Sequence, residues 1–237
     1  MAPDADKLSK EALSKYYGPL SLYAEKAMGD VRWCLDNSME TSKDKNVQRI
    51  YKSSTKKQRV KPEGSLLKKC HRDNITAPES IPDIIEDVIG IRIVTSNKNE
   101  AAELFEFLRT NKDSWFCDVV GEPKFTPYTI AERNRYSILS GYQAYHITFV
   151  YQQSYHPVTD ISRWPVEMQL TSLLWEFWAN YSREYFYSRP GGMAEKLRPY
   201  TVAISKTLDS AEDLMATTTE ILLGETQSEQ GNAPEKE

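Results

Sequence analysis

Cysteine, histidine and long apolar runs are scarce in this sequence, and each shortage excludes a class of protein. Its 237 residues include three cysteines and three histidines. The cysteines are scattered without metal-ligand spacing, so reduced thiols in the cytoplasm are the simplest interpretation. No apolar stretch has the length of a membrane span, and the opening "MAPDADKLSK" lacks the basic-then-apolar order of a secretion signal. We therefore expect a cytoplasmic protein with no membrane partner.

Basic residues are not in excess either, because the formal net charge is −4. The chain as a whole is therefore not a basic nucleic-acid binder. The charge is uneven, however: between Lys52 and Arg72 there are eight Lys and Arg and one acid, Glu63, which gives a local net charge of +7. Such a segment inside an acidic protein favours binding of a polyanion, although a solvated surface is the usual alternative.

Hydrophobic periodicity predicts helices around a sheet. A first helix is expected over 8–40, with a break or kink at Gly18-Pro19. Further helices are expected after Pro62-Glu63 and over 97–112, 172–188 and 194–223. Strands are expected over 49–61, 87–96, 115–123, 145–151 and 164–170. The expected fold class is therefore α/β (α+β), with a mixed sheet of about five strands flanked by helices.

These segments divide the chain into four regions. They are an N-terminal helical region (1–50), a core (51–190), a C-terminal helix packed on the core (191–223) and a disordered acidic tail (224–237). Residues 41–47 and 122–141 are expected to be loops. A loop as long as the second is usually functional or mobile.

Carboxylates on two predicted strands indicate a chemistry for the core. Alternation in "WPVEMQL" places Glu167 and Gln169 on one face and apolar residues on the other, while Asp87 heads "DVIGIRIV". Two carboxylates aimed at one cleft can hold Mg²⁺, which takes its remaining ligands from phosphates and water. With the basic segment as a phosphate clamp, these are the requirements of phosphoryl-type transfer. The alternative is that both acids are ordinary strand-edge residues.

Asp87 and Arg92 raise a geometric question. They are five residues apart, so a regular strand would place them on opposite faces. If both are to reach one ligand, Asp87 must precede the strand or the strand must bulge near Gly90.

Four short motifs occur in order within residues 50–187: "RVKPEGSLLKK", "DVIGIR", "GYQAYH", and "VEMQL" followed by "EFWA". Together they resemble the RelA/SpoT-type alarmone synthetases. The family's own motifs read Arg-x-Lys-xxx-Ser-xxx-Lys, Asp-xx-Gly/Ala-x-Arg, Gly-Tyr-Gln/Arg-Ser-Leu/Ile-His, and Val-Glu-Ile-Gln-Ile before a Phe-Trp-Ala helix. The resemblance implies a small, synthetase-only member, with residues 51–190 as a nucleotidyltransferase-like core.

The resemblance implies a pyrophosphokinase that moves the β,γ-diphosphate of ATP to the 3′-hydroxyl of GDP or GTP, makes the alarmone (p)ppGpp and releases AMP. Asp87 would bind Mg²⁺, and Glu167 would be a second metal ligand or the base. The implied ATP-binding residues are Arg59 and Arg92 around the adenine, and Lys61, Ser65 and Lys69 on the phosphates. The implied acceptor-binding residues are Tyr142, His146, Gln169 and Arg135.

The acceptor side departs from the family pattern. Thr171-Ser172 replaces the usual Arg-Thr, Ser182-Arg183 replaces Glu-His, and Ile138 replaces a lysine. Other acceptors therefore remain open, namely adenine nucleotides or the 3′ end of tRNA, which toxic family members use. In that case tRNA and an antitoxin protein become candidate partners.

Three further expectations follow. The hydrolase domain of long family members should be absent, because three histidines are too few for its metal site. The aromatic-rich and terminal helices could form the interface of a homo-oligomer. A catalytically inactive nucleotide sensor is a third possible function, against which the presence of both Asp87 and Glu167 argues.

Overall fold

The computed structural model describes residues 7–111, 124–126, 133–134, 143–152, 163–184 and 193–231. Its strands are β1 (Thr55–Val60), β2 (Ile89–Thr95), β3 (Lys124–Thr126), β4 (Arg133–Asn134), β5 (Tyr145–Gln152) and β6 (Arg163–Ser172). Its helices are α1 (Lys10–Thr41), α2 (Lys45–Ser53), α3 (Glu63–Arg72), a 3₁₀ turn at Pro78–Ser80, α4 (Ile81–Ile84), α5 (Lys98–Thr110), α7 (Leu173–Ser182) and α8 (Met193–Gly231). The fold is α+β with a mixed sheet, as expected.

The sheet has the strand order β1-β2-β6-β5-β3, and β4 also pairs with β5. The central pair β2–β6 is parallel, whereas β1–β2 and β5–β6 are antiparallel. Four long strands form its body, and the short β3 and β4 raise the count among the described residues to six. Both short strands lie in the segment expected to be a loop. The sequence did not predict them because two or three residues are too few to show an alternation. The strand expected over 115–123 lies outside the described residues.

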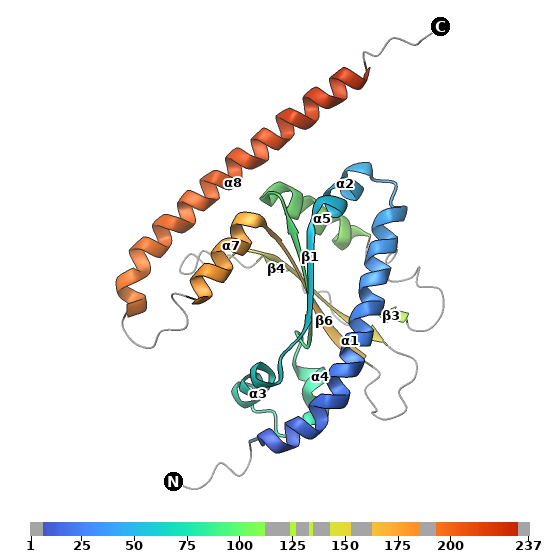
Figure 1. Ribbon diagram of the computed structural model, residues 1–237, viewed down its shortest axis with the longest axis vertical. Coiled ribbons are helices and arrows are strands. Elements are labelled where there is room, and N and C mark those ends of the chain that lie inside the picture. The colour runs from blue at the N-terminus through green and yellow to red at the C-terminus, as the bar shows by residue number, and fades with distance from the viewer. Residues whose placement is uncertain are drawn as a thin grey trace.

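One face of the sheet is apolar and carries the core. Its buried residues alternate along the three central strands: Ile89, Ile91, Ile93, Ile147, Phe149, Tyr151, Val166, Met168 and Leu170. Helices α1 and α5 pack on this face through their own buried leucines, such as Leu35 and Leu104. Figure 1 shows α1 on one side of the sheet and α3, α7 and α8 on the other. The polar face of the sheet is therefore directed toward α3 and α7.

Helix α1 is not broken at Gly18-Pro19, which excludes the first of the two outcomes expected there, a break or a kink. It runs from Lys10 to Thr41 with Pro19 inside it. Its buried positions continue at helical spacing on both sides of the proline: Leu13, Leu20, Ala24, Ala27, Val31 and Leu35. Burial of this stripe outweighs the cost of an internal proline, about 3 kcal/mol.

Residues 45–53 form α2, although the sequence pattern favoured a loop and the start of a strand. The Asp44 carboxylate caps this helix by accepting hydrogen bonds from the backbone N–H groups of Asn46 (3.0 Å) and Val47 (3.1 Å). Val47, Ile50 and Tyr51 are buried at helical spacing. A stripe of three residues is too short to distinguish a helix from a strand by its period. In the structure the first strand begins only at Thr55.

Helix α8 extends to Gly231, past Gly224, where a disordered tail was expected to begin. The polar residues of this stretch are compatible with a helix that is already nucleated by its packed portion. That portion lies against α5 and α7. Among the described helices, none has the length and apolarity needed to span a membrane.

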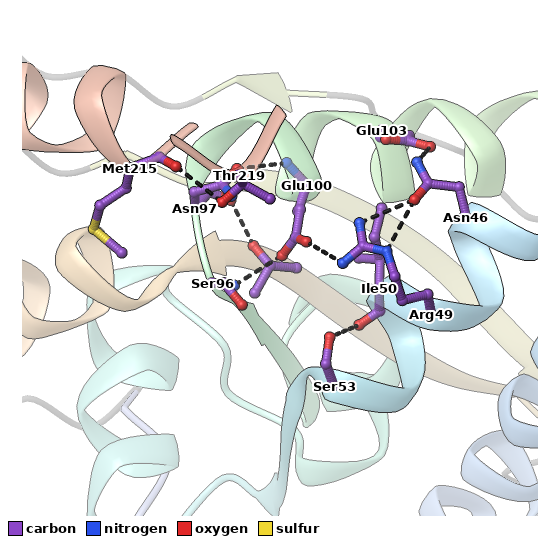
Figure 2. A network of polar contacts seen from close by, with 11 residues as sticks. Asn46, Arg49, Ile50, Ser53, Ser96, Asn97, Glu100, Glu103, Met215 and Thr219 are labelled. Atoms are coloured by element: carbon purple, nitrogen blue, oxygen red, sulfur yellow. Dashed lines mark hydrogen bonds and ion pairs between the residues drawn. The ribbon is translucent and has the colours of Figure 1, made fainter. Parts of the chain in front are cut away.

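The start of α5 joins α8 to α2, as Figure 2 shows. Asn97 caps α5 through Oδ1, which accepts from Glu100 N at 3.0 Å, and its Nδ2 donates to Thr219 Oγ1 of α8 at 3.3 Å. On the other side, the Glu100 carboxylate accepts from Arg49 of α2 at 2.8 Å and from Ser96 N at 3.2 Å. This polar network fixes two helices around the end of β2.

Candidate functional site

Strand register gathers polar side chains on one face of the sheet. Residues paired across neighbouring strands share a face, so two rows run across it. The first row is Arg59 (β1), Gly90 (β2), Glu167 (β6) and Thr148 (β5). The second row is Lys57, Arg92, Gln169 and His146 on the same strands. The Arg59 side chain passes over Gly90, where a Cβ would lie 3.7 Å from Arg59 Cγ, an ordinary van der Waals contact.

A cleft of about 800 Å³ lies over this face, lined also by α3 and α7. It contains all the expected ATP-binding residues, both expected catalytic carboxylates and two of the acceptor-side residues: Arg59, Lys61, Ser65, Lys69, Arg92, Asp87, Glu167, His146 and Gln169. A second pocket of about 260 Å³ shares Arg59, Asp87, Arg92 and Glu167 with it, so the two pockets adjoin. The smaller pocket adds Lys57 and Glu176.

Asp87 reaches the cleft because it precedes the strand. It lies in the turn between α4 and β2, and β2 pairs through Gly90 without a bulge. The carboxylate lies between two lysines: Lys61 Nζ is 2.5 Å from Oδ2 and Lys69 Nζ is 2.5 Å from Oδ1. A backbone hydrogen bond from Lys61 N to Val88 O (2.9 Å) joins the two segments. The first of the two alternatives for Asp87 and Arg92 is therefore correct.

The charge state of Asp87 follows from this environment. Burial opposes ionisation and by itself would raise the pKa of the carboxyl. The hydrogen bonds and positive charges of Lys61 and Lys69 outweigh burial, so the pKa is lowered below its ordinary value. Asp87 is therefore ionised at neutral pH.

Glu167 is held by two neighbours on the polar face. Its Oε1 is 2.9 Å from His146 Nδ1, and its Oε2 accepts from Gln169 Nε2 at 2.8 Å. Burial raises the pKa of Glu167, but the interactions with His146 and Gln169 exceed this effect and lower the pKa overall. The negative charge of Asp87, which lines the same cleft, acts in the opposite direction. Because a carboxylate only accepts, His146 Nδ1 carries the proton.

Arg92 is held at both edges. Gln169 Oε1 accepts from Arg92 Nε (3.0 Å) and Nη2 (2.5 Å), and Glu176 Oε1 lies 3.6 Å from Nη1. Glu176 also pairs with Lys57 Nζ at 2.8 Å. Sequence reasoning missed Glu176 because its partners lie on distant strands and no spacing links them.

The carboxylate pair is compatible with Mg²⁺. Both side chains are ionised, both line the cleft, and both offer the hard oxygen ligands that Mg²⁺ prefers. The described part of the chain contains no group of three or more residues that could hold a metal. Two protein carboxylates supplemented by phosphate and water are a usual arrangement for Mg²⁺.

The remaining acceptor-side expectations have mixed outcomes. Tyr142 and Arg135 lie outside the described residues. Thr171 and Ser172, which replace the family's Arg-Thr, are buried: Thr171 Oγ1 donates to Gln143 O at 3.2 Å, and Ser172 Oγ donates to Glu212 of α8. These two residues therefore support the fold. Ser182 and Arg183 line the cleft.

The fold matches solved structures of small alarmone synthetases. The structure of small alarmone synthetase 1 from Bacillus subtilis bound to its product pppGpp matches with a TM-score of 0.63, covering 90% of this chain and 99% of that chain at 22% identity. A second structure of that synthetase gives a TM-score of 0.52 at 26% identity, covering 73% and 79%. A GTP pyrophosphokinase family protein from Streptococcus pneumoniae matches with a TM-score of 0.54 at 17% identity, covering 90% and 91%.

The sequence comparison names the family. The family model described as "Region found in RelA / SpoT proteins" matches residues 58–191, more than half of the chain. The chain therefore belongs to the RelA/SpoT family, as the four motifs indicated. The GTP pyrophosphokinase YjbM of Bacillus subtilis is 29% identical over 140 residues, and the chain spans 59% of that protein's length.

Proposed function

We propose that this chain is a pyrophosphokinase that transfers the β,γ-diphosphate of ATP to the 3′-hydroxyl of GDP or GTP. The observation that carries the proposal is the convergence of Asp87 and Glu167 with Lys61 and Lys69 in one cleft. In the reaction the acceptor 3′-oxygen bonds to the β-phosphorus of ATP. The bond between that phosphorus and the α,β-bridging oxygen breaks, and AMP leaves with the oxygen.

The chain's own residues position the reactants and carry charge. Asp87 and Glu167 would hold Mg²⁺, which when bound neutralises charge on the transferred diphosphate. Lys61 and Lys69 contact Asp87, and both would bind the phosphates. The Asp87 carboxylate would then contact the two lysines and the metal together. Glu167 either completes the metal site or takes the proton of the 3′-hydroxyl, and both roles require the ionised carboxylate that its lowered pKa provides. Arg59 and Arg92, which line both adjoining pockets, would flank the adenine.

A screen of acceptors tests the proposal. The protein is incubated with Mg²⁺, γ-labelled ATP and one of GDP, GTP, AMP, ADP or deacylated tRNA. We expect AMP release and label in a 3′-diphosphorylated guanine nucleotide. Asp87→Asn should lose on the order of 100-fold in rate. Asp83→Asn, an exposed acid on α4, serves as the control and should retain the wild-type rate.

The other outcomes are also informative. If no acceptor supports AMP release, the proposal is wrong. If Asp87→Asn binds nucleotide and otherwise behaves as the wild type in every assay, the protein is a sensor and not an enzyme.

A tRNA acceptor is the second candidate, and the rim of the cleft favours it. Lys68, Arg72 and Arg183 line the cleft and are exposed, so a polyanion longer than a mononucleotide could contact them. Label in deacylated tRNA but not in GDP would establish this candidate, and binding should weaken steeply with salt. A homo-oligomer, an antitoxin partner and a cytoplasmic location remain predictions from the sequence.

A further inference from the structure

Gln169 lies between Arg92, an expected ATP-binding residue, and Glu167, an expected catalytic residue. Its side-chain oxygen accepts two hydrogen bonds from Arg92, at 3.0 Å from Nε and 2.5 Å from Nη2, and its side-chain nitrogen donates to Glu167 Oε2 at 2.8 Å. A guanidinium only donates and a carboxylate only accepts, so one amide orientation satisfies both neighbours. A flipped amide would direct N–H groups at Arg92 and an oxygen at Glu167.

This arrangement leaves Gln169 little capacity to bind a substrate. The amide oxygen has two acceptor positions, and Arg92 uses both of them. The amide nitrogen has two N–H groups, of which Glu167 takes one. The resemblance to the family had suggested that Gln169 binds the acceptor, but the side chain is mostly occupied by protein neighbours.

The two neighbours of Gln169 have different expected roles. The Arg92 guanidinium is held in its plane by Gln169 along one edge and by Glu176 Oε1, 3.6 Å from Nη1, at the other. In-plane contacts orient the flat faces of the guanidinium, which are the surfaces that stack on a nucleobase. Glu167, on the reaction side, is bound through Oε1 to His146 and through Oε2 to Gln169.

We propose that Gln169 is a positioning residue that fixes Arg92 for the donor base and Glu167 for the transfer step, and that it does not bind the acceptor. The inference rests on the proposed function for its kinetic part. Its structural part, the orientation of Arg92 by Gln169, can be tested by nucleotide binding alone.

Two substitutions separate the two hydrogen-bonding ends of Gln169. Gln169→Met keeps the length of the side chain and removes both the acceptor for Arg92 and the donor to Glu167. Gln169→Glu keeps an acceptor for Arg92 but replaces the N–H donor to Glu167 with a carboxylate. The control is Gln48→Met on α2, which likewise removes a side-chain amide whose nitrogen donates to two acceptors, here Glu40 O and Ser42 O outside the cleft. Thermal unfolding of each variant establishes that it is folded.

The binding measurement uses the ATP analogue AMPCPP, whose methylene bridge cannot be cleaved to release AMP. Calorimetry should show binding about tenfold weaker in Gln169→Met, since hydrogen bonds to a charged group are lost, and within about twofold of wild type in Gln169→Glu and Gln48→Met. Equal binding in all four proteins would overturn the inference, even if the wild type proved inactive with every acceptor.

The kinetic measurement uses the acceptor identified by the screen. Both Gln169 variants should lose about 10- to 100-fold in kcat, as is typical when a residue that orients a functional side chain is removed. The acceptor KM should stay within about twofold. A raised acceptor KM with unchanged kcat would instead show that Gln169 binds the acceptor. Absence of AMP release by the wild type would refute the proposed function and leave the AMPCPP comparison to decide the role of Gln169.

Discussion

His146 Nδ1 donates a 2.9 Å hydrogen bond to Glu167 Oε1 inside the candidate site. The imidazole is 2% exposed, so this contact is made largely away from solvent. The resemblance to the family implied that His146 contacts an acceptor phosphate. In the structure the Nδ1 side of the ring contacts a carboxylate, so the position of Glu167 depends on His146. The contact of His146 with the acceptor stays a prediction.

Substitution of His146 tests that dependence. His146→Ala should lower kcat about 10- to 100-fold, because Glu167 loses a donor that orients it. His146→Asn offers an amide N–H near the place of Nδ1 and should retain more activity than the alanine variant. Steady-state kinetics with the identified acceptor measure both. Equal losses in the two variants, or an effect on the acceptor KM alone, would contradict this role.

Glu176 gives a prediction about the donor side. Its Oε1 pairs with Lys57 at 2.8 Å and lies 3.6 Å from Arg92 Nη1, in the smaller pocket. Glu176→Gln removes the negative charge that holds the guanidinium edge, so we expect the KM for ATP to rise about tenfold with little change in the acceptor KM. Glu106→Gln, which breaks an exposed pair with Arg109 on α5, is the control and should change neither KM.

The cap of α5 gives a prediction about stability. Asn97 both caps this helix and donates to Thr219 of α8. Asn97→Ala should lower the free energy of unfolding by about 1–2 kcal/mol, and Asn97→Asp, which keeps the cap acceptor, by less. Thermal unfolding should detect this, since a protein of this size loses about 2–4 °C in Tm per kcal/mol. A Tm for Asn97→Ala equal to that of wild type would show that the cap contributes nothing.

Glu212 gives a prediction about pH. It is fully buried in α8, and burial raises the pKa of its carboxyl above the ordinary 4.5, although hydrogen bonds from Ser172 Oγ, Lys98 N and Leu174 N act the other way. The folded state therefore keeps this proton to higher pH than the unfolded chain does. The associated stability is fully present below about pH 4.5 and is lost as pH rises through the raised pKa.

Residue 212 cannot ionise in Glu212→Gln, so this variant should not lose the associated stability as pH rises. Urea unfolding of wild type and variant from about pH 4.5 to about pH 7 should show the variant gaining stability relative to wild type, by at most about 1.4 kcal/mol per pH unit. Glu220→Gln, an exposed acid on the same helix, is the control for removing a carboxylate from α8. A difference between Glu212→Gln and wild type that does not vary with pH would contradict the raised pKa.

Local patterns determined the central elements of this protein. The alternation in "WPVEMQL" predicted β6 with Glu167 and Gln169 on its polar face, and the stripe after Asn97 predicted α5. The four motifs predicted the family and the residues that meet in the cleft. These predictions succeed because each pattern spans several residues within one element, where period and capping suffice.

Only the tertiary structure decided the elements that depend on distant partners. α1 continues through Pro19 because its buried stripe packs on the sheet, and α2 forms because its three buried residues pack in the core while Asp44 caps its first turn. The roles of side chains in the cleft were decided in the same way. Gln169 lies beside Arg92 because parallel pairing sets β2 beside β6 in one register. Its hydrogen bonds to Arg92 and to Glu167 on its own strand depend on atomic geometry that no spacing in the sequence records.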